Sequence, residues 1–152
     1  MKMTKTVIAV AIAAGMSLPA WGGEYATKDE AIAMVNKAVA FYKKEGAEKA
    51  FAAFDKKPGD FTDRDLYVLV YSTSGKVLAH GSNVKLVGKD LSDATDVDGK
   101  PYVKERMALA AKQKTFWQDY KFVNPVTKKI EPKEAYCDVE GDAIICSGVY
   151  KK

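Results

Sequence analysis

The chain contains a single histidine, His80, at the end of the stretch LYVLVYSTSGKVLAHG. A Ser-His-Asp or Cys-His catalytic arrangement would have to use this imidazole, because a nucleophile needs its base within hydrogen-bond reach. The sequence has no G-x-S-x-G or H-E-x-x-H motif. We therefore predict that the protein is not an enzyme, and we keep a small hydrolase or isomerase with His80 as general base as an alternative. A ligand contact and a buried structural histidine are the other two roles open to this residue.

The only two cysteines, Cys137 and Cys146, lie in the stretch AYCDVEGDAIICSGVY. A hairpin with Gly141 and Asp142 as its loop makes the cysteines direct cross-strand neighbours at a non-hydrogen-bonded position, where Cβ atoms lie about 4.5–5.5 Å apart. A disulfide needs about 3.5–4.5 Å, which a twisted hairpin can supply. In an exported protein this geometry favours a structural bridge, and no C-x-x-C spacing indicates thiol exchange.

The stretch DATDVDGKPYVKE is the one candidate for a metal site. With Gly99 at position 6 of a calcium loop, Asp96, Asp98 and Glu105 fall at positions 3, 5 and 12. Position 1 is then Ala94, which cannot bind the ion. We therefore predict no metal site, and interpret the stretch as a solvated turn before a helix.

Arg106 and Lys133 lie in sequence among many aromatic residues. A tyrosine offers an apolar wall and one hydroxyl, which suits the lining of a small polar pocket. Alternation along strands sends about half of such residues inward, so most of them are expected in the core. The aromatic residues concerned are Tyr67, Tyr71, Tyr102, Phe116, Trp117, Tyr120, Phe122, Tyr136 and Tyr150.

The elements that must position these residues are helices and strands in separate runs. Thr27 and Glu30 have the spacing of a capping box, and apolar residues then recur at helical spacing. Gly46 either kinks one long helix or separates two. Later stretches are rich in β-branched and aromatic residues and are broken by turn residues such as Ser74-Gly75. The expected elements are a helical region over 28–56, two strands within 65–81, a helix over 101–113, a strand over 115–125 and the hairpin over 134–150, with 126–132 as a loop.

This segregated order predicts an α+β domain. We expect an antiparallel sheet of about five strands, the long N-terminal helix packed over one face and a short helix in the middle connection. The chain has 152 residues, of which 47% are hydrophobic and 29% charged, which is typical of one globular domain.

The first 22 residues have the three-part layout of a secretory signal peptide, with Lys2 and Lys5, an apolar run over residues 7–18 and small residues near Ala20. The apolar run is shorter than the roughly 20 residues of a membrane span. We predict cleavage near residues 20–23, with an uncleaved anchor as the alternative, and a single periplasmic domain over residues 23–152 without a membrane span. Removing both lysines lowers the formal net charge from +4 to +2, which does not favour nucleic acid as a partner.

Five stretches together resemble the single Cache domains of bacterial sensors. They are LYVLVYSTSGKVLAHGSNVKLVGKDL, DVDGKPYVKERMALAAKQ, DYKFVNP, EPKEAYC and SGVY, in that order. The resemblance implies a PAS-like sheet whose pocket binds a small metabolite, often a short carboxylate such as acetate, propionate, lactate or pyruvate. It implies no cofactor.

Carried over to this sequence, the resemblance makes His80, Tyr120, Phe122, Lys133 and Tyr136 candidate ligand contacts. Arg106 and Tyr102 are further candidates. The implied function is a free-standing Cache domain that binds a small organic acid, with His80 as a hydrogen-bonding group and Lys133 as the partner of the carboxylate. It would present the complex to a membrane sensor or a transporter. The alternative is a protein-interaction module whose pocket is vestigial.

Overall fold

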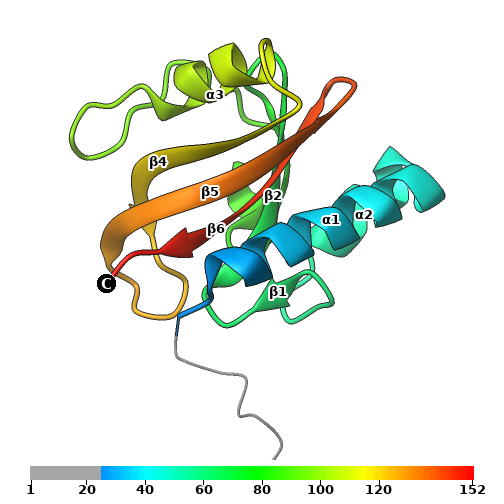
Figure 1. Ribbon diagram of the computed structural model, residues 1–152, viewed down its shortest axis with the longest axis horizontal. Helices are drawn as coiled ribbons and strands as arrows, with labels where there is room; N and C mark the ends of the chain where they lie inside the picture. The colour runs from blue at the N-terminus through cyan, green and yellow to red at the C-terminus, as the bar shows by residue number, and fades with distance from the viewer. Residues whose placement is uncertain (1–24) are drawn as a thin grey trace, which may run out of the picture.

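A computed structural model describes residues 25–152, so the predicted signal peptide lies outside the described residues. Figure 1 shows an antiparallel sheet with helices on both faces. Five strands run in the order β3-β2-β6-β5-β4, and the short strand β1 also pairs with β2. The predicted α+β class with a PAS-like antiparallel sheet is confirmed. The strands are β1 (Thr62–Asp63), β2 (Leu66–Ser72), β3 (Val77–His80), β4 (Thr115–Val123), β5 (Ile130–Glu140) and β6 (Ala143–Tyr150).

The long N-terminal helix begins where the capping box places it. Thr27 accepts a hydrogen bond from the backbone N–H of Glu30, and the Glu30 side chain accepts one from the backbone N–H of Thr27. Gly46, at a φ of 83°, separates two helices, which settles the open alternative of a kink or a break. The helices are α1 (Lys28–Glu45), α2 (Ala47–Phe54) and α3 (Tyr102–Ala110), with a 3₁₀ turn η1 (Val84–Leu86).

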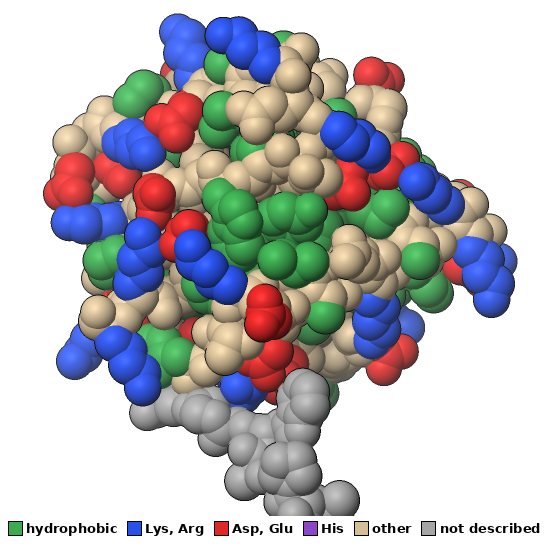
Figure 2. All heavy atoms as spheres, viewed as in Figure 1, with side chains coloured by type: hydrophobic (Ala, Val, Ile, Leu, Met, Phe, Trp, Pro, Cys, Tyr) green, Lys and Arg blue, Asp and Glu red, His purple; other side chains and the backbone are tan. Residues whose placement is uncertain are grey.

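Each face of the sheet has its own hydrophobic core. Helices α1 and α2 pack on one face, where Val35 and Phe54 meet Val68 and Ile145. Helix α3 packs on the other face, where Val103 meets aromatic residues of the strands. Figure 2, in the same view as Figure 1, shows a hydrophobic patch surrounded by charged side chains where β5 and the first half of α1 lie.

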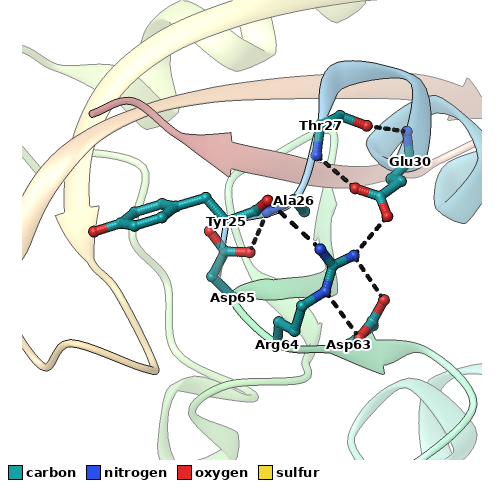
Figure 3. Close-up of polar contacts among 7 residues, drawn as sticks. All are labelled: Tyr25, Ala26, Thr27, Glu30, Asp63, Arg64 and Asp65. Atoms are coloured by element: carbon teal, nitrogen blue, oxygen red, sulfur yellow. Dashed lines mark hydrogen bonds and ion pairs between the residues drawn. The ribbon is translucent and has the colours of Figure 1, made fainter. Parts of the chain in front are cut away.

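The start of α1 is held by the connection between β1 and β2 (Figure 3). The backbone N–H of Ala26 donates to the buried carboxylate of Asp65 over 2.8 Å. Arg64 pairs with Glu30 in the first turn of α1 at 2.6 Å, and with its neighbour Asp63 at 2.9 Å. The entry of the chain into the domain is therefore tied to the strand that carries Tyr67.

The β5–β6 hairpin has the predicted register. Cys137 lies opposite Cys146, and the disulfide joins them with a Cα–Cα distance of 4.1 Å. Strand β5, however, begins at Ile130, inside the segment that we expected to be a loop. The carbonyl of Pro132 accepts a hydrogen bond from the backbone N–H of Lys151, just past the end of β6. The nitrogen of Pro132 faces the same side of β5 as this carbonyl. Because β6 has already ended there, no strand hydrogen bond is lost through the missing N–H, and the proline is tolerated.

Candidate functional site

Two cations, Arg106 and Lys133, are buried on the α3 face of the sheet, with 1% and 0% of their surface exposed. Neither forms an ion pair with a carboxylate of residues 25–152. Buried charges are normally paired, because removing an ion from water costs several kcal/mol. These two side chains are therefore the most unusual feature of the core.

Arg106 of α3 lies within a box of tyrosine rings. Its guanidinium carbon is 4.8 Å from the Tyr71 ring centroid, 5.1 Å from that of Tyr120 and 5.7 Å from that of Tyr102. Its Nε donates to Gln118 Oε1 at 3.0 Å. In the described structure Nη2 is buried without a hydrogen-bond partner. Since an arginine is always charged, this nitrogen is a strong donor that lacks an acceptor.

Lys133 of β5 starts a chain of hydrogen bonds. Its Nζ donates to Tyr67 Oη at 2.8 Å, Tyr67 and Tyr150 join their hydroxyls at 3.1 Å, and Tyr150 donates to the carbonyl of Val123 at 2.7 Å. Because the Tyr150 proton goes to Val123, the proton between the two phenols comes from Tyr67. Burial lowers the pKa of Lys133 well below its ordinary value, and the charge of Arg106 lowers it further.

A glycine of β6 makes room for the Lys133 stem. A Cβ at Gly148 would lie 2.8 Å from Lys133 Cε and 2.8 Å from Ala135 Cα on β5. Any larger residue would push the lysine or the strand away.

His80 lies at the end of β3, 1% exposed, with its ring 5.2 Å from that of Tyr67 and 5.8 Å from that of Phe122. Its Nδ1 lies 3.1 Å from the backbone N–H of Asn83, which donates to it, so we assign the proton of the neutral ring to Nε2. Burial lowers the pKa of His80 to about 3, assisted by the charges of Lys133 and Arg106. The imidazole is therefore neutral at pH 7.

Aromatic rings join these groups into one cluster. Tyr102 and Tyr120 stack at 4.9 Å with nearly parallel planes, and Phe122 meets Tyr120 edge to face at 6.1 Å. The structure thus brings six of the seven predicted ligand contacts together, and with Tyr67 we call them the cation–aromatic cluster. Its members are Tyr67, His80, Tyr102, Arg106, Tyr120, Phe122 and Lys133.

Tyr136 does not belong to this cluster, which corrects its placement. It follows Lys133 by three residues on β5, and successive side chains of a strand point to opposite faces. Its half-buried ring instead packs 5.2 Å from Trp117, in the core formed with α1. Tyr136 therefore lies across the sheet from the two buried cations.

Residues 20–151 match the family model described as Single Cache domain 2. The chain belongs to this family.

Solved structures with the same fold include a Cache chemosensory domain described for its carboxylic acid recognition, with 21% identity and a TM-score of 0.71, covering 82% of this chain and 92% of that one. A methyl-accepting chemotaxis protein from Vibrio parahaemolyticus RIMD 2210633 has 20% identity and a TM-score of 0.71, over 81% and 87% of the two chains. A periplasmic sensor domain of a chemotaxis protein has 21% identity and a TM-score of 0.64, over 82% and 90%. At these identities the likeness shows the fold alone. A search of curated proteins found no match.

A surface pocket of this Cache domain, of about 200 Å³, is lined by Tyr120 and Lys133 of the cluster together with the carboxylates Asp96, Asp98 and Asp119. Two further surface pockets lie beside the cluster. One, of about 200 Å³, includes Asn83, next to His80 in space, and Phe122. The other, of about 170 Å³, includes Tyr102 and Phe122. Phe122 is common to these two further pockets and to the cluster, so its ring forms part of the boundary between the cluster and the surface.

The stretch considered as a calcium loop is a hydrogen-bonded turn. The carboxylate of Asp96 accepts from the backbone N–H groups of Asp98, Lys100 and Lys121. Asp98 pairs with the Lys121 side chain at 2.8 Å. Within residues 25–152 no group of three or more acidic, histidine or cysteine side chains is arranged to hold a metal ion, and no helix there is long and apolar enough to cross a membrane.

Sequence reasoning did not select four side chains of the Cache site as ligand contacts, although three of them, the tyrosines below, were among the aromatic residues suited to a pocket. Tyr67 and Tyr71 lie on one face of β2 because they are four residues apart, and Tyr150 lies opposite Lys133 in the hairpin register. Extending the alternation and the register would have found these three. Gln118, which binds the guanidinium of Arg106, depends on the packing of α3 against β4 and has no local signal.

Proposed function

We propose that this Cache domain binds a small organic carboxylate in the cation–aromatic cluster. The observation that carries the proposal is the buried, unpartnered Nη2 of Arg106, together with a second buried cation that also lacks a carboxylate. An anion from outside the chain would satisfy both, and hydrogen bonds between charged groups are about twice as strong as neutral ones. The carboxylic acid recognition described for a solved Cache domain of the same fold supports the proposal.

Each residue of the cluster has a role in this proposal. Arg106 holds the carboxylate through its unpaired nitrogen, and Lys133, which like Arg106 lies near the Tyr120 ring, donates a further hydrogen bond. His80 donates from Nε2 to a polar atom of the ligand. The stacked rings of Tyr102 and Tyr120 form an apolar wall, and the Tyr120 hydroxyl orients the ligand. Phe122 moves to admit the ligand from the surface pockets.

The predicted signal peptide and the family together support an exported, periplasmic protein that passes its ligand state to a membrane sensor or transporter. A second candidate is an interaction module. It is favoured by the half-buried pair of Trp117 and Tyr136 on the α1 face and by the hydrophobic patch of Figure 2. In such a module the pocket is vestigial and a protein partner binds to the sheet or the long helix, so partner binding would not depend on the buried cations. The two candidates can therefore be separated.

The test is a thermal-unfolding screen of residues 23–152 against short carboxylates and amino acids. A ligand at 100 times its Kd adds about 2.7 kcal/mol of stability, which raises Tm by several degrees for a domain of this size. We expect Arg106→Met and Lys133→Met to lose the shift. Tyr136→Phe, on the other face, is the matched control and should keep it. A screen without any shift, or a shift unchanged in both cation variants, would contradict the proposal.

A further inference from the structure

We propose that Lys133 forms a reversible imine with the carbonyl carbon of a 2-oxo acid bound in the cation–aromatic cluster. This inference rests on the proposed function and gives its site a preferred class of ligand. It goes further, because the lysine then acts as a nucleophile as well as a hydrogen-bond donor.

The surroundings of Lys133 are those that activate an amine. A lysine becomes nucleophilic when it is desolvated in an apolar pocket or placed beside another cation. Lys133 meets both conditions, since it is fully buried and its charged form is opposed by Arg106. Four rings contribute walls, those of Tyr67 at 4.0 Å, Tyr150 at 5.1 Å and Tyr120 and Phe122 at 5.8 Å each.

The charged groups around the lysine do not restore its proton. Asp65 is the carboxylate that favours the ammonium form, but its effect is smaller than those of burial and of Arg106. It makes no ion pair with Lys133; its Oδ1 accepts from Ala26, and its Oδ2 is buried without a hydrogen-bond partner. His80 is neutral and adds no negative charge. Burial and the charge of Arg106 therefore lower the pKa of Lys133 in the folded protein, which favours the amine form more than water does.

The hydrogen-bond chain leaves the nitrogen lone pair free. The phenol proton of Tyr67 is donated to Tyr150, because the proton of Tyr150 goes to Val123. Tyr67 can therefore only accept from Lys133, and does not occupy its lone pair. The chain fixes the position of Nζ without blocking its attack.

The second cation can hold the other end of an oxo acid. The Tyr120 ring centroid lies 5.1 Å from the guanidinium carbon of Arg106 and 5.8 Å from Nζ of Lys133, so the two cations are at most about 11 Å apart. In this proposal, a carboxylate bound to the unpaired nitrogen of Arg106 directs its neighbouring carbon towards Lys133. In a 2-oxo acid that neighbouring carbon is the electrophile, whereas in a simple or 2-hydroxy acid it is not.

The reaction needs no other reactant. The lone pair of Nζ adds to the carbonyl carbon, and the π electrons of the carbonyl move to its oxygen, which receives a proton from the nitrogen. The resulting carbinolamine then loses its hydroxyl and the remaining N–H proton as one water molecule, and a C=N bond forms. Water reverses the reaction, so binding stays an equilibrium.

The experiment is reductive trapping. The domain is incubated with pyruvate and sodium cyanoborohydride, digested and mapped by mass spectrometry, with propionate and lactate as carboxylates that cannot form an imine. We expect one reduced adduct on Lys133, at least tenfold more abundant than on any surface lysine. Arg106→Met should lower it to the surface level, because the carboxylate loses its anchor. Lys133→Arg keeps a cation and should remove the adduct.

The outcomes separate this inference from the proposed function. If propionate raises Tm but pyruvate gives no adduct on Lys133 above the surface level, the imine is refuted while carboxylate binding stands. If no carboxylate raises Tm and no adduct forms, both fail. Mapping of the unaltered protein decides the question even if a variant does not fold.

Discussion

Replacing His80 by asparagine tests whether the cluster holds a neutral imidazole in the apo protein. The folded pKa of about 3 lies below the unfolded value of 6.5, so acid adds a proton to the unfolded state before the folded one. The stability conferred by the neutral ring is complete above pH 6.5 and falls as pH drops towards 3. At 1.36 kcal/mol per pH unit, the wild-type protein should lose about 2.5 kcal/mol between pH 7 and pH 4.5 through this residue alone.

Urea unfolding at the two pH values, followed by circular dichroism, measures the loss. The carboxylates titrate in both proteins, so the difference between the stability losses of wild type and His80→Asn isolates the contribution of the histidine. Asparagine is the matched variant, because its side-chain oxygen can still accept from the backbone N–H of Asn83 but does not titrate. The wild-type midpoint should fall by about 1–2 M more than that of the variant. Equal losses in the two proteins would show that the folded state does not oppose protonation of His80, and the reasoning on burial would be refuted.

Three further predictions concern the elements around the site. For Lys133, the folded pKa is depressed, so the wild-type protein should gain stability over Lys133→Met as pH rises from 7 towards 10 in urea titrations, and parallel curves would contradict this. Reducing the Cys137–Cys146 bond, which closes a loop with a sequence separation of 9, should cost about 2–3 kcal/mol in the same assay, and an unchanged midpoint would count against a structural role. Gly148→Ala should cost about 1–3 kcal/mol and weaken the carboxylate thermal shift, because its methyl group meets the Lys133 stem; a variant that binds as wild type would show that the stem is free to move.

The fold could be predicted from the sequence wherever a local rule fixes geometry. The capping box of Thr27 and Glu30 starts α1 at the expected residue, and the turn at Gly141 and Asp142 sets the register that pairs the cysteines. The start of β5 could not be predicted this way. Pro132 is typical of a loop, and it is tolerated only because β6 ends before it, which depends on the length of a strand that comes later in the chain.

The site shows the same division between local and tertiary information. The resemblance to Cache domains made both Lys133 and Tyr136 contacts of the same ligand. The two residues are three positions apart on one strand, and side chains alternate between the two faces, so they must lie on opposite faces. The physical rule was available from the sequence and decides against Tyr136. The environment of Arg106 was not available, because the box of Tyr71, Tyr102 and Tyr120 is assembled from β2, α3 and β4.

The charge of the cluster is itself an argument for a ligand. Apolar side chains of similar size at Arg106 and Lys133 would spare the domain the burial of two charges, and such replacements are often neutral or stabilising. The chain instead places both cations against aromatic faces, which compensate a buried charge only in part, at about 2 kcal/mol for a desolvated contact. The acceptor that Arg106 lacks is therefore best explained as a group that arrives with the ligand. Binding of an anion should then stabilise the domain by more than the contacts it adds, because it also relieves the repulsion between the two cations.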